Sequence, residues 1–458
     1  MHKIITVREF ARISIGEGKS TSLDEAHVTQ LDFDWLCQLS ASFRSTGAPL
    51  VQIDNRRWLR LDNYVGVLQT PSGTRIEILP KIESETSNVE TTRALLVRMI
   101  QVAMDLPTRS VGATDLSLFD APLTEWVIHQ FLANLDHLVK RGIRFDYQQV
   151  EDELRYLRGQ LYLPKQLRQP PGRGHYFQVR HDLFAADCPE NRLLKAALIR
   201  AARHTQNSRN WRLSHELLSV MNEIPASQQI QADFRRWRQD RLMAHYEPIK
   251  PWCELILGEQ MPLAVFGDWH GMSMLFPMEK LFEQYVEVYL RTHLYKGNRL
   301  TAPAASEYLC AHQGKRFFQL RPDFLISGSE QCWILDTKWK KLDSKDAKNH
   351  FGLSQSDFYQ LFAYGHQYLQ GVGDLALIYP MSPSFKQPME PFAFSEKLRL
   401  WVLPFDLQAN NLISPNDLPL PIKKIDIPGN DSNLLRQPVE YDFSRTGLFA
   451  ETLRLNTE

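Results

Sequence analysis

The chain has 458 residues, 43% of them hydrophobic and 23% charged, as in a globular protein of two or three domains. Its 53 Lys and Arg balance 53 Asp and Glu, so composition argues against a basic protein that only coats nucleic acid but leaves a local binding patch open. It has no apolar run of membrane-spanning length and its first residues lack a signal-peptide core, so we expect a cytoplasmic protein without membrane contact.

Residues 1–88 are expected to form a β-rich N-terminal domain. Two runs of β-forming residues, Tyr64–Thr70 and Thr74–Pro80, flank the turn residues Pro71, Ser72 and Gly73, which predicts a hairpin. The polar stretch 83–88 is typical of a linker.

Residues 89–250 are predicted to be mainly helical. Apolar residues at helical spacing predict four helices, at Thr91–Leu106, Leu123–Lys140, Glu190–His204 and Gln228–His245. The stretch Arg144–Leu163 is instead expected to be extended. Four arginines surround a tryptophan in 234–241, a pattern that favours a solvated helix face over phosphate binding.

Residues 251–407 have the pattern of a compact α/β domain with a mixed sheet flanked by helices. We expect helices at Phe276–His293 and Gln355–Gln370, and strands at Ala305–Cys310, Arg316–Ser327, Cys332–Lys340, Asp374–Tyr379 and Leu398–Leu407. The Pro- and Asn-rich tail, 408–458, is expected to be irregular and to wrap back on the body.

Candidate metal ligands flank a polar turn in this domain. If the turn is centred between Ser329 and Glu330, Asp323 stands opposite Asp336 on the same face of a hairpin. Two opposed carboxylates repel each other, which favours a bound cation, and hard oxygen ligands favour Mg²⁺ or Mn²⁺.

Lys338 follows Asp336 by two residues and so shares its face of the strand, while Leu335, Thr337 and Trp339 should face packing helices. Such a trio can hold a metal ion and activate a water molecule. The bland alternative is an exposed hairpin with charges on its wet face, and the Pro-Asp at the paired position favours the site.

Neighbouring helices offer further candidates. Gln360 and Tyr364 share one helix face and can position a lysine, a water or a phosphate. Ser354 and Asp357 have the spacing of a capping box, so Asp357 is expected to be a cap partner. On the preceding helix, Glu283 is the candidate third metal ligand, and the flanking acidic residues 279 and 287 fit a solvated face better.

The five cysteines are scattered without a C-x-x-C pair, which argues against a disulfide framework, a zinc site or an iron–sulfur cluster. Pro-Asp paired with Asp-x-Lys and followed by Gln-x-x-x-Tyr resembles the PD-(D/E)xK nuclease superfamily. Within it the chain resembles the McrC family, the nuclease subunit of 5-methylcytosine-dependent restriction systems. The resemblance also covers 64–67, 76–82, 157–161, 191–195, 275–283 and 335–339.

This resemblance implies a Mg²⁺-dependent DNA endonuclease that acts on double-stranded DNA. It assigns Asp323 and Asp336 as metal ligands, Lys338 as the catalytic lysine, and Gln360 and Tyr364 as the supporting motif. It also implies an McrB-like AAA+ GTPase partner, to which the N-terminal region docks and whose GTP hydrolysis the chain stimulates, and it allows dimerisation through assembly of the complex. The chain has no P-loop motif, so the GTPase must be another chain.

Two other functions remain open. One is a RecB-like repair nuclease that acts on DNA ends without a motor, which would leave a circular modified plasmid intact. The other is a non-catalytic activator of an AAA+ partner, in which the carboxylates are only structural.

Overall fold

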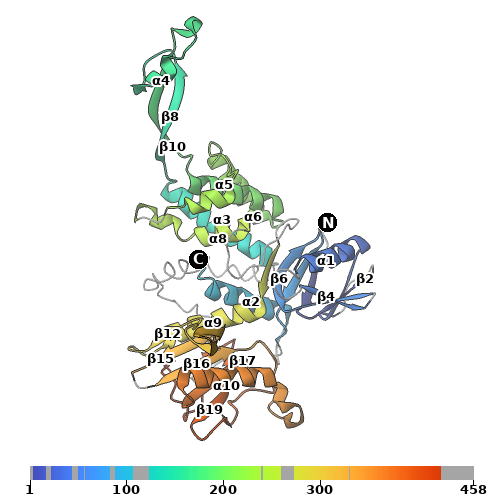
Figure 1. Ribbon diagram of the computed structural model, residues 1–458. Helices are drawn as coiled ribbons and strands as arrows, with labels where there is room; N and C mark the ends of the chain where they lie inside the picture. The colour runs from blue at the N-terminus through green and yellow to red at the C-terminus, as the bar shows by residue number, and fades with distance from the viewer. Residues whose placement is uncertain are drawn as a thin grey trace.

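The computed structural model describes residues 4–16, 22–43, 50–55, 57–82, 88–106, 123–238, 241–258, 273–329 and 331–423. Residues 83–87 of the expected linker and 424–458 of the expected tail lie outside these ranges. The fold is mixed α/β (Figure 1). Within the part of the chain that is described, no helix is long and apolar enough to cross a membrane.

Two four-stranded sheets dominate the N-terminal part, which confirms its β-rich character. The first sheet contains β1 (Ile4–Arg8), β7 (Arg75–Leu79), β6 (Tyr64–Gln69) and β11 (Met274–Pro277), in that order. The second contains β3 (Glu25–Val28), β2 (Arg12–Ile15), β5 (Trp58–Leu61) and β4 (Val51–Asn55), and helix α1 (Gln30–Phe43) packs against it.

The predicted hairpin is confirmed as β6–β7, closed by a hydrogen bond from Thr70 N to Thr74 O of 2.9 Å. Strand β11 comes from far along the sequence and pairs with β6. Gly66 makes this possible, because its φ is +129° and a Cβ atom there would lie 2.0 Å from Met274 O.

A helical body follows. Its helices are α2 (Val89–Ala103), α3 (Leu123–Arg141), α5 (Pro189–His204), α6 (Ser208–Val220), α7 (Ile230–Arg235), η3 (Arg241–Tyr246) and α8 (Lys250–Leu257). Large aromatic side chains fill its interior; Trp252 is fully buried, with its ring 5.2 Å from that of Trp126. Three of the four predicted helices are confirmed.

The single helix predicted over Gln228–His245 is wrong. Helix α7 ends at Arg235, and the backbone N of Arg238 donates to Glu190 Oε1 at 2.9 Å, so a tertiary hydrogen bond replaces a helical one. Trp237 is buried while the arginines at 235, 236 and 238 are exposed, as expected of a solvated surface.

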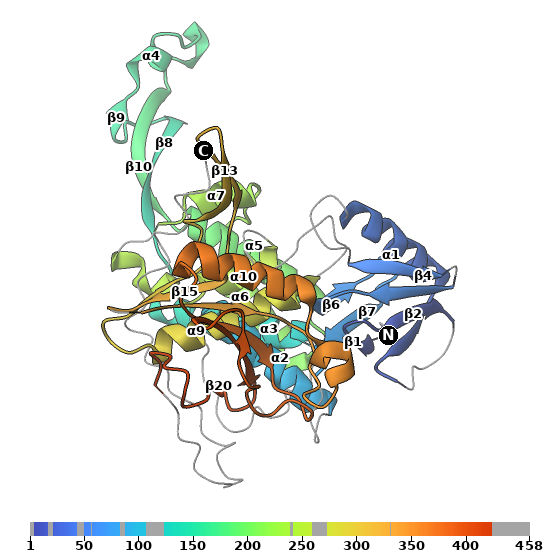
Figure 2. The same ribbon diagram turned by 60° about the horizontal axis from the view of Figure 1, so that its bottom comes forward.

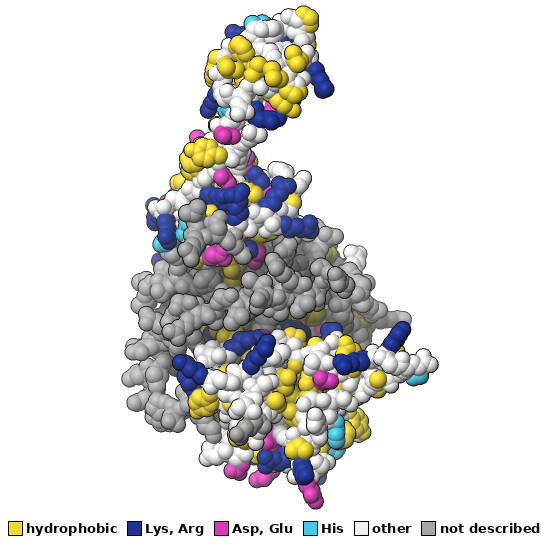
Figure 3. Space-filling model, turned by 60° about the vertical axis from the view of Figure 1, so that its left-hand side comes forward, with side chains coloured by type: hydrophobic (Ala, Val, Ile, Leu, Met, Phe, Trp, Pro, Cys, Tyr) yellow, Lys and Arg dark blue, Asp and Glu magenta, His cyan; other side chains and the backbone are white. Residues whose placement is uncertain are grey.

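A long arm projects from the helical body (Figure 1). It contains β8 (Asp146–Leu154), β9 (Gln160–Leu161), α4 (Leu163–Gln166), η2 (Pro171–Arg173) and β10 (Phe177–Ala185), so the extended structure expected at Arg144–Leu163 is confirmed. Hydrophobic side chains gather at its tip (Figure 3), among them Tyr156, Leu157 and Leu167, which are all exposed. Such a surface is typical of contact with another macromolecule.

The C-terminal sheet runs β12-β15-β16-β17-β19-β18. Its strands are β12 (Arg299–Thr301), β15 (Phe324–Ser327), β16 (Cys332–Thr337), β17 (Gly373–Pro380), β18 (Phe392–Ala393) and β19 (Leu398–Asp406), with β20 (Asn411–Leu412) beside β19. Antiparallel pairing at β15–β16 and parallel pairing at β16–β17 make the sheet mixed, as expected.

Two helices cover opposite faces of this sheet. Alternate side chains of β16 contact α9 (Met278–His293) on one face and α10 (Gln355–Leu369) on the other: Leu335 belongs to the core that contains Phe282, and Ile334 to the core that contains Leu361. A short η4 (Ala347–Gly352) precedes α10. Along the chain these elements follow one another as α9, β12, β15, β16, α10 and β17, with a separate hairpin inserted between β12 and β15.

The first two strands were predicted at the wrong residues. Of the strand predicted at 305–310, only residues 308–310 are in a strand, β13 (Tyr308–His312), which among the described residues pairs only with β14 (Lys315–Gln319) in a separate hairpin. The stretch Arg316–Ser327 is therefore two strands, interrupted where Pro322 provides no backbone N–H for a sheet. The described part of the tail, 408–423, wraps back on the body: β20 joins the sheet, and Leu418, Leu420 and Ile422 are buried in the core.

Candidate functional site

The β15–β16 hairpin has the predicted register. Phe324 pairs with Leu335, so Asp323, just before β15, is opposite Asp336 by one further step. The carboxylate of Asp323, however, turns toward Thr337: its Oδ2 accepts hydrogen bonds of 2.7 Å from both Thr337 N and Thr337 Oγ1. Thr337 was expected to face only packing helices, and it instead fixes Asp323, which has left the regular strand.

Asp336 lies at the buried end of the site, with only 1% of its surface exposed. The pKa of its carboxyl group is raised to about 7, mainly by burial and also by the charge of Asp323, while Lys338 acts to lower the pKa. Asp323 and Asp336 are therefore close enough to repel each other. Two such carboxylates are stabilised by any cation placed between them.

Lys338 supplies one cation. Its Nζ donates a hydrogen bond to Asp336 Oδ2 and lies 3.4 Å from Gln360 Oε1. Burial lowers the pKa of Lys338, but Asp336, Asp323 and Asp357 together outweigh burial and raise the pKa above its usual value. The ammonium group is therefore charged at neutral pH, beside both carboxylates.

Gln360 and Tyr364 link this lysine to the other strand. Gln360 Nε2 donates to Tyr364 Oη at 2.7 Å, and Tyr364 Oη donates to Arg321 O at 3.1 Å. One face of α10 thus holds Lys338 and also the backbone two residues before Asp323. Burial raises the pKa of Tyr364 to about 12, so its hydroxyl remains a donor.

Glu283 is near the site, but its carboxylate is paired with another residue. Burial raises the pKa of its carboxyl group, and the charge of Asp323 raises it as well, so Glu283 and Asp323 are close enough to repel each other. Glu283 Oε2 nevertheless forms a 2.6 Å ion pair with Lys280. Among the residues that the structure describes, no three His, Cys, Asp or Glu side chains converge closely enough to hold a metal ion.

Asp357 is not the cap partner that its spacing from Ser354 predicted. Ser354 is the N-cap of α10 but makes no side-chain capping bond, so the predicted capping box is wrong. Asp357 is buried, forms a 3.3 Å ion pair with Lys340, and raises the pKa of Asp336. Its spacing of three and seven residues from Gln360 and Tyr364 places it on the same helix face, which was the available signal.

The donor set suits Mg²⁺ or Mn²⁺. Both central ligands are carboxylates that repel each other, and Mg²⁺ typically takes one or two protein carboxylates and fills its other positions with water and phosphate oxygens. Asp323 and Asp336 would hold the ion, and Glu283 would join them only by leaving Lys280.

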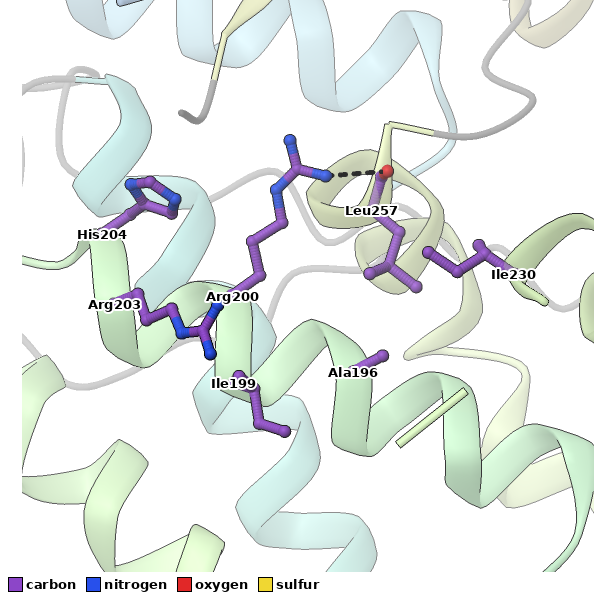
Figure 4. Close-up of a pocket in the computed structure, with 7 residues that line it drawn as sticks. All are labelled: Ala196, Ile199, Arg200, Arg203, His204, Ile230 and Leu257. Atoms are coloured by element: carbon purple, nitrogen blue, oxygen red, sulfur yellow. Dashed lines mark hydrogen bonds between the residues drawn. The ribbon is translucent and has the colours of Figure 1, made fainter. Parts of the chain in front are cut away.

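A pocket elsewhere does not belong to this site. It lies on the helical body (Figure 4), lined by Ala196, Ile199, Arg200, Arg203, His204, Ile230 and Leu257. Arg200 spans it and donates to Leu257 O at 3.0 Å. It contains none of the candidate site residues.

Comparison with known proteins gives a consistent relationship. The profile of the McrBC 5-methylcytosine restriction system component family matches residues 59–380, more than half of the chain. A refined half-complex from a tetradecameric assembly of Thermococcus gammatolerans McrB AAA+ hexamers with bound McrC is similar in structure. It has a TM-score of 0.65 and 19% identity, and the match covers 88% of this chain and 95% of that chain.

The cryo-EM structure of the Thermococcus gammatolerans McrBC complex also matches, with a TM-score of 0.48 and 22% identity over 63% of this chain and 87% of that chain. No curated protein matches this chain. The likeness to the half-complex shows a shared fold.

Proposed function

Because the chain belongs to the McrBC 5-methylcytosine restriction system component family, we propose that it is the Mg²⁺-dependent DNA endonuclease subunit of a modified-cytosine-dependent restriction system. It cuts double-stranded DNA when docked on an McrB-like AAA+ GTPase, and it stimulates GTP hydrolysis by that partner. The similar half-complex, which contains McrB AAA+ hexamers with bound McrC, supports a partner of this kind.

The observation that carries the proposal is the joining of Asp336, Lys338 and Gln360 in one hydrogen-bonded chain beside Asp323. This is the arrangement that a PD-(D/E)xK nuclease requires. It brings an ammonium group and two acidic side chains together from two adjacent strands.

Each side chain then has a chemical task. Asp323 and Asp336 would hold Mg²⁺, which when bound polarises the phosphate and lowers the pKa of a water molecule. Lys338 stays protonated and stabilises the negative charge that develops on the phosphate during attack. Gln360 and Tyr364 keep the ammonium group and the Asp323 strand in register.

The test uses the full chain with its AAA+ GTPase, a circular plasmid containing methylated cytosine, GTP and Mg²⁺. We expect Asp336→Ala and Lys338→Ala to abolish cleavage while both variants still fold and stimulate GTP hydrolysis. Lys345→Ala, which removes an exposed lysine from the same region, is the matched control and should cut normally. Normal cleavage by either site variant would refute the mechanism, and cleavage of the circular substrate excludes an end-dependent nuclease.

One observation favours a second candidate, a non-catalytic activator of the AAA+ partner: Glu283 is paired with Lys280 rather than with the other carboxylates. Calorimetric titration with Mn²⁺ separates the two. Binding that is lost in Asp323→Asn supports the nuclease, whereas an absence of binding by the wild-type protein supports the activator.

A further inference from the structure

The β13–β14 hairpin stands apart from every sheet of the described chain. Its strands pair only with each other, and nearly all their residues are exposed. The turn at Gln313 and Gly314 has positive φ at both positions, as in a tight two-residue hairpin turn. Figure 2 shows the hairpin rising beyond helix α10.

The hairpin surface is basic and aromatic. Between Glu307 and Asp323 the sequence has no acidic residue, but it has Lys315, Arg316 and Arg321. Arg321 donates to the neutral Gln319, and none of the three cations forms an ion pair with an acidic side chain of the described residues. They therefore remain available for phosphate groups.

Phe318 is the penultimate residue of β14 and lies near the base of the hairpin. Its φ is +60°, which is strained for a bulky residue, and 72% of its surface is exposed. Phe317 is exposed as well. A hairpin that presents aromatic rings beside cations with no acidic partner among the described residues matches nucleic acid, whose bases offer flat apolar faces next to charged phosphates.

The base of the hairpin is fixed to the candidate site. The Tyr368 hydroxyl shares its proton between Leu320 O at 3.0 Å and Ala304 O at 3.2 Å, so one side chain contacts the chain both before and after the hairpin. Tyr364, one turn earlier on the same helix, holds Arg321 O. The hairpin and Asp323 are thus positioned by one helix and joined by three residues of chain.

We propose that the β13–β14 hairpin binds duplex DNA and holds it against the Asp323–Asp336 site. Lys315, Arg316 and Arg321 contact phosphates, and Phe318 presses on base edges in a groove. Strands of five residues are roughly 17 Å long, enough to cross a major groove about 12 Å wide, which admits a two-stranded β-ribbon. The part of this proposal that places DNA against the site rests on the proposed nuclease function.

Two exposed cysteines allow DNA protection of the hairpin to be measured with an internal control. Cys310 lies on the hairpin and Cys332 begins β16 at the end of the sheet away from Asp323; both are exposed and unbridged. Alkylation of the full chain with iodoacetamide, with and without a duplex oligonucleotide in EDTA, is followed by peptide mass spectrometry. We expect DNA to slow modification of Cys310 at least about 5-fold and to leave Cys332 unchanged. Equal rates at Cys310 with and without saturating DNA would overturn the proposal.

Three variants test the chemistry by fluorescence anisotropy over a range of salt concentrations. Lys315→Ala with Arg316→Ala should reduce the slope of log affinity against log salt by about 2, since each neutralised phosphate contributes about 0.9. Phe318→Gly keeps the positive φ and removes only the ring, so it should weaken binding roughly 5-fold without changing the slope. The control, Lys296→Ala with Arg299→Ala, removes two exposed cations near the other end of β15.

The proposal is refuted if the variant with Lys315→Ala and Arg316→Ala keeps the wild-type DNA affinity and salt slope. It is also refuted if the control pair of substitutions lowers the DNA affinity as much as the hairpin pair does. These measurements need no cleavage, so the two proposals fail separately. A wild-type protein that binds through the hairpin but never cuts DNA would refute only the nuclease function. Normal DNA cleavage and binding by the hairpin variants would refute only the role of the hairpin.

Discussion

Glu9 provides a test of the packing beside the candidate site, at the end of strand β16. It is 1% exposed, and its Oε1 accepts hydrogen bonds from Lys81 N at 2.7 Å and from Trp339 Nε1 at 2.9 Å. Burial is the main cause that raises the pKa of Glu9 from 4.5 to about 7, against the lowering effect of these two donors. The other oxygen, Oε2, has no hydrogen-bond partner among the described residues.

The pKa rise makes stability depend on pH. Because the pKa in the folded state is above the unfolded value, the folded protein binds more protons between pH 4.5 and about 7. The free energy of unfolding therefore falls as pH rises through this window and stays at the lower level above it. The difference between the two pKa values is equivalent to about 3 kcal/mol, of which about 2 to 3 kcal/mol is lost between pH 5 and pH 8.

The measurement is urea unfolding followed by tryptophan fluorescence, for the wild-type protein and Glu9→Gln, at pH 5 and pH 8. The amide does not titrate, so the stability of the variant relative to the wild type should rise by that amount over the interval. A fixed cost of the unpaired amide N–H₂ cancels in this comparison. Glu396→Gln, an exposed control, should follow the wild type, and parallel pH profiles for the wild type and Glu9→Gln would refute the reasoning.

Two further variants test other contacts. Tyr364→Phe removes the hydroxyl that joins Gln360 to Arg321 O, so Mg²⁺-dependent cleavage should fall roughly 10- to 100-fold. The control is Tyr359→Phe, on the exposed face of the same helix, which should cut normally. Equal cleavage rates for the two variants would contradict the positioning role of Tyr364. Glu77→Gln removes the carboxylate that accepts two 2.7 Å hydrogen bonds from the buried Arg93. The free energy of unfolding should therefore fall by about 3 to 5 kcal/mol. An unchanged urea midpoint would show that the pair does not stabilise the contact of β7 with α2.

Local patterns predicted the elements around the site well. The β15–β16 register followed from a polar turn between two apolar runs, and the face of α10 followed from a four-residue spacing. Both are short-range properties, set by the two-residue period of a strand and the 3.6-residue period of a helix. They placed Gln360 and Tyr364 on one helix face as candidates to position a lysine, a water or a phosphate, and Lys338 Nζ lies 3.4 Å from Gln360 Oε1.

Tertiary contacts overrode the local signal elsewhere. The backbone N of Arg238 bonds to Glu190 instead of extending a helix, and Asp357 pairs with Lys340 instead of capping one. In each case a charged side chain from another element competes with a local hydrogen bond that the sequence also offered. Helical periodicity contains no information about that competitor.

The distance along the sequence between two contacting residues explains which contacts could be predicted and which could not. The contacts that assemble the candidate site join residues 14 apart for Asp323 and Thr337, 22 apart for Lys338 and Gln360, and 43 apart for Tyr364 and Arg321. The contact behind it, Glu9 with Trp339, joins residues 330 apart. Trp339 directly follows Lys338, so the chain at the end of β16 is held by α10 through Gln360 and by Glu9, which directly follows β1, through Trp339. The first support is encoded in a motif, whereas the second arises only when the whole chain packs.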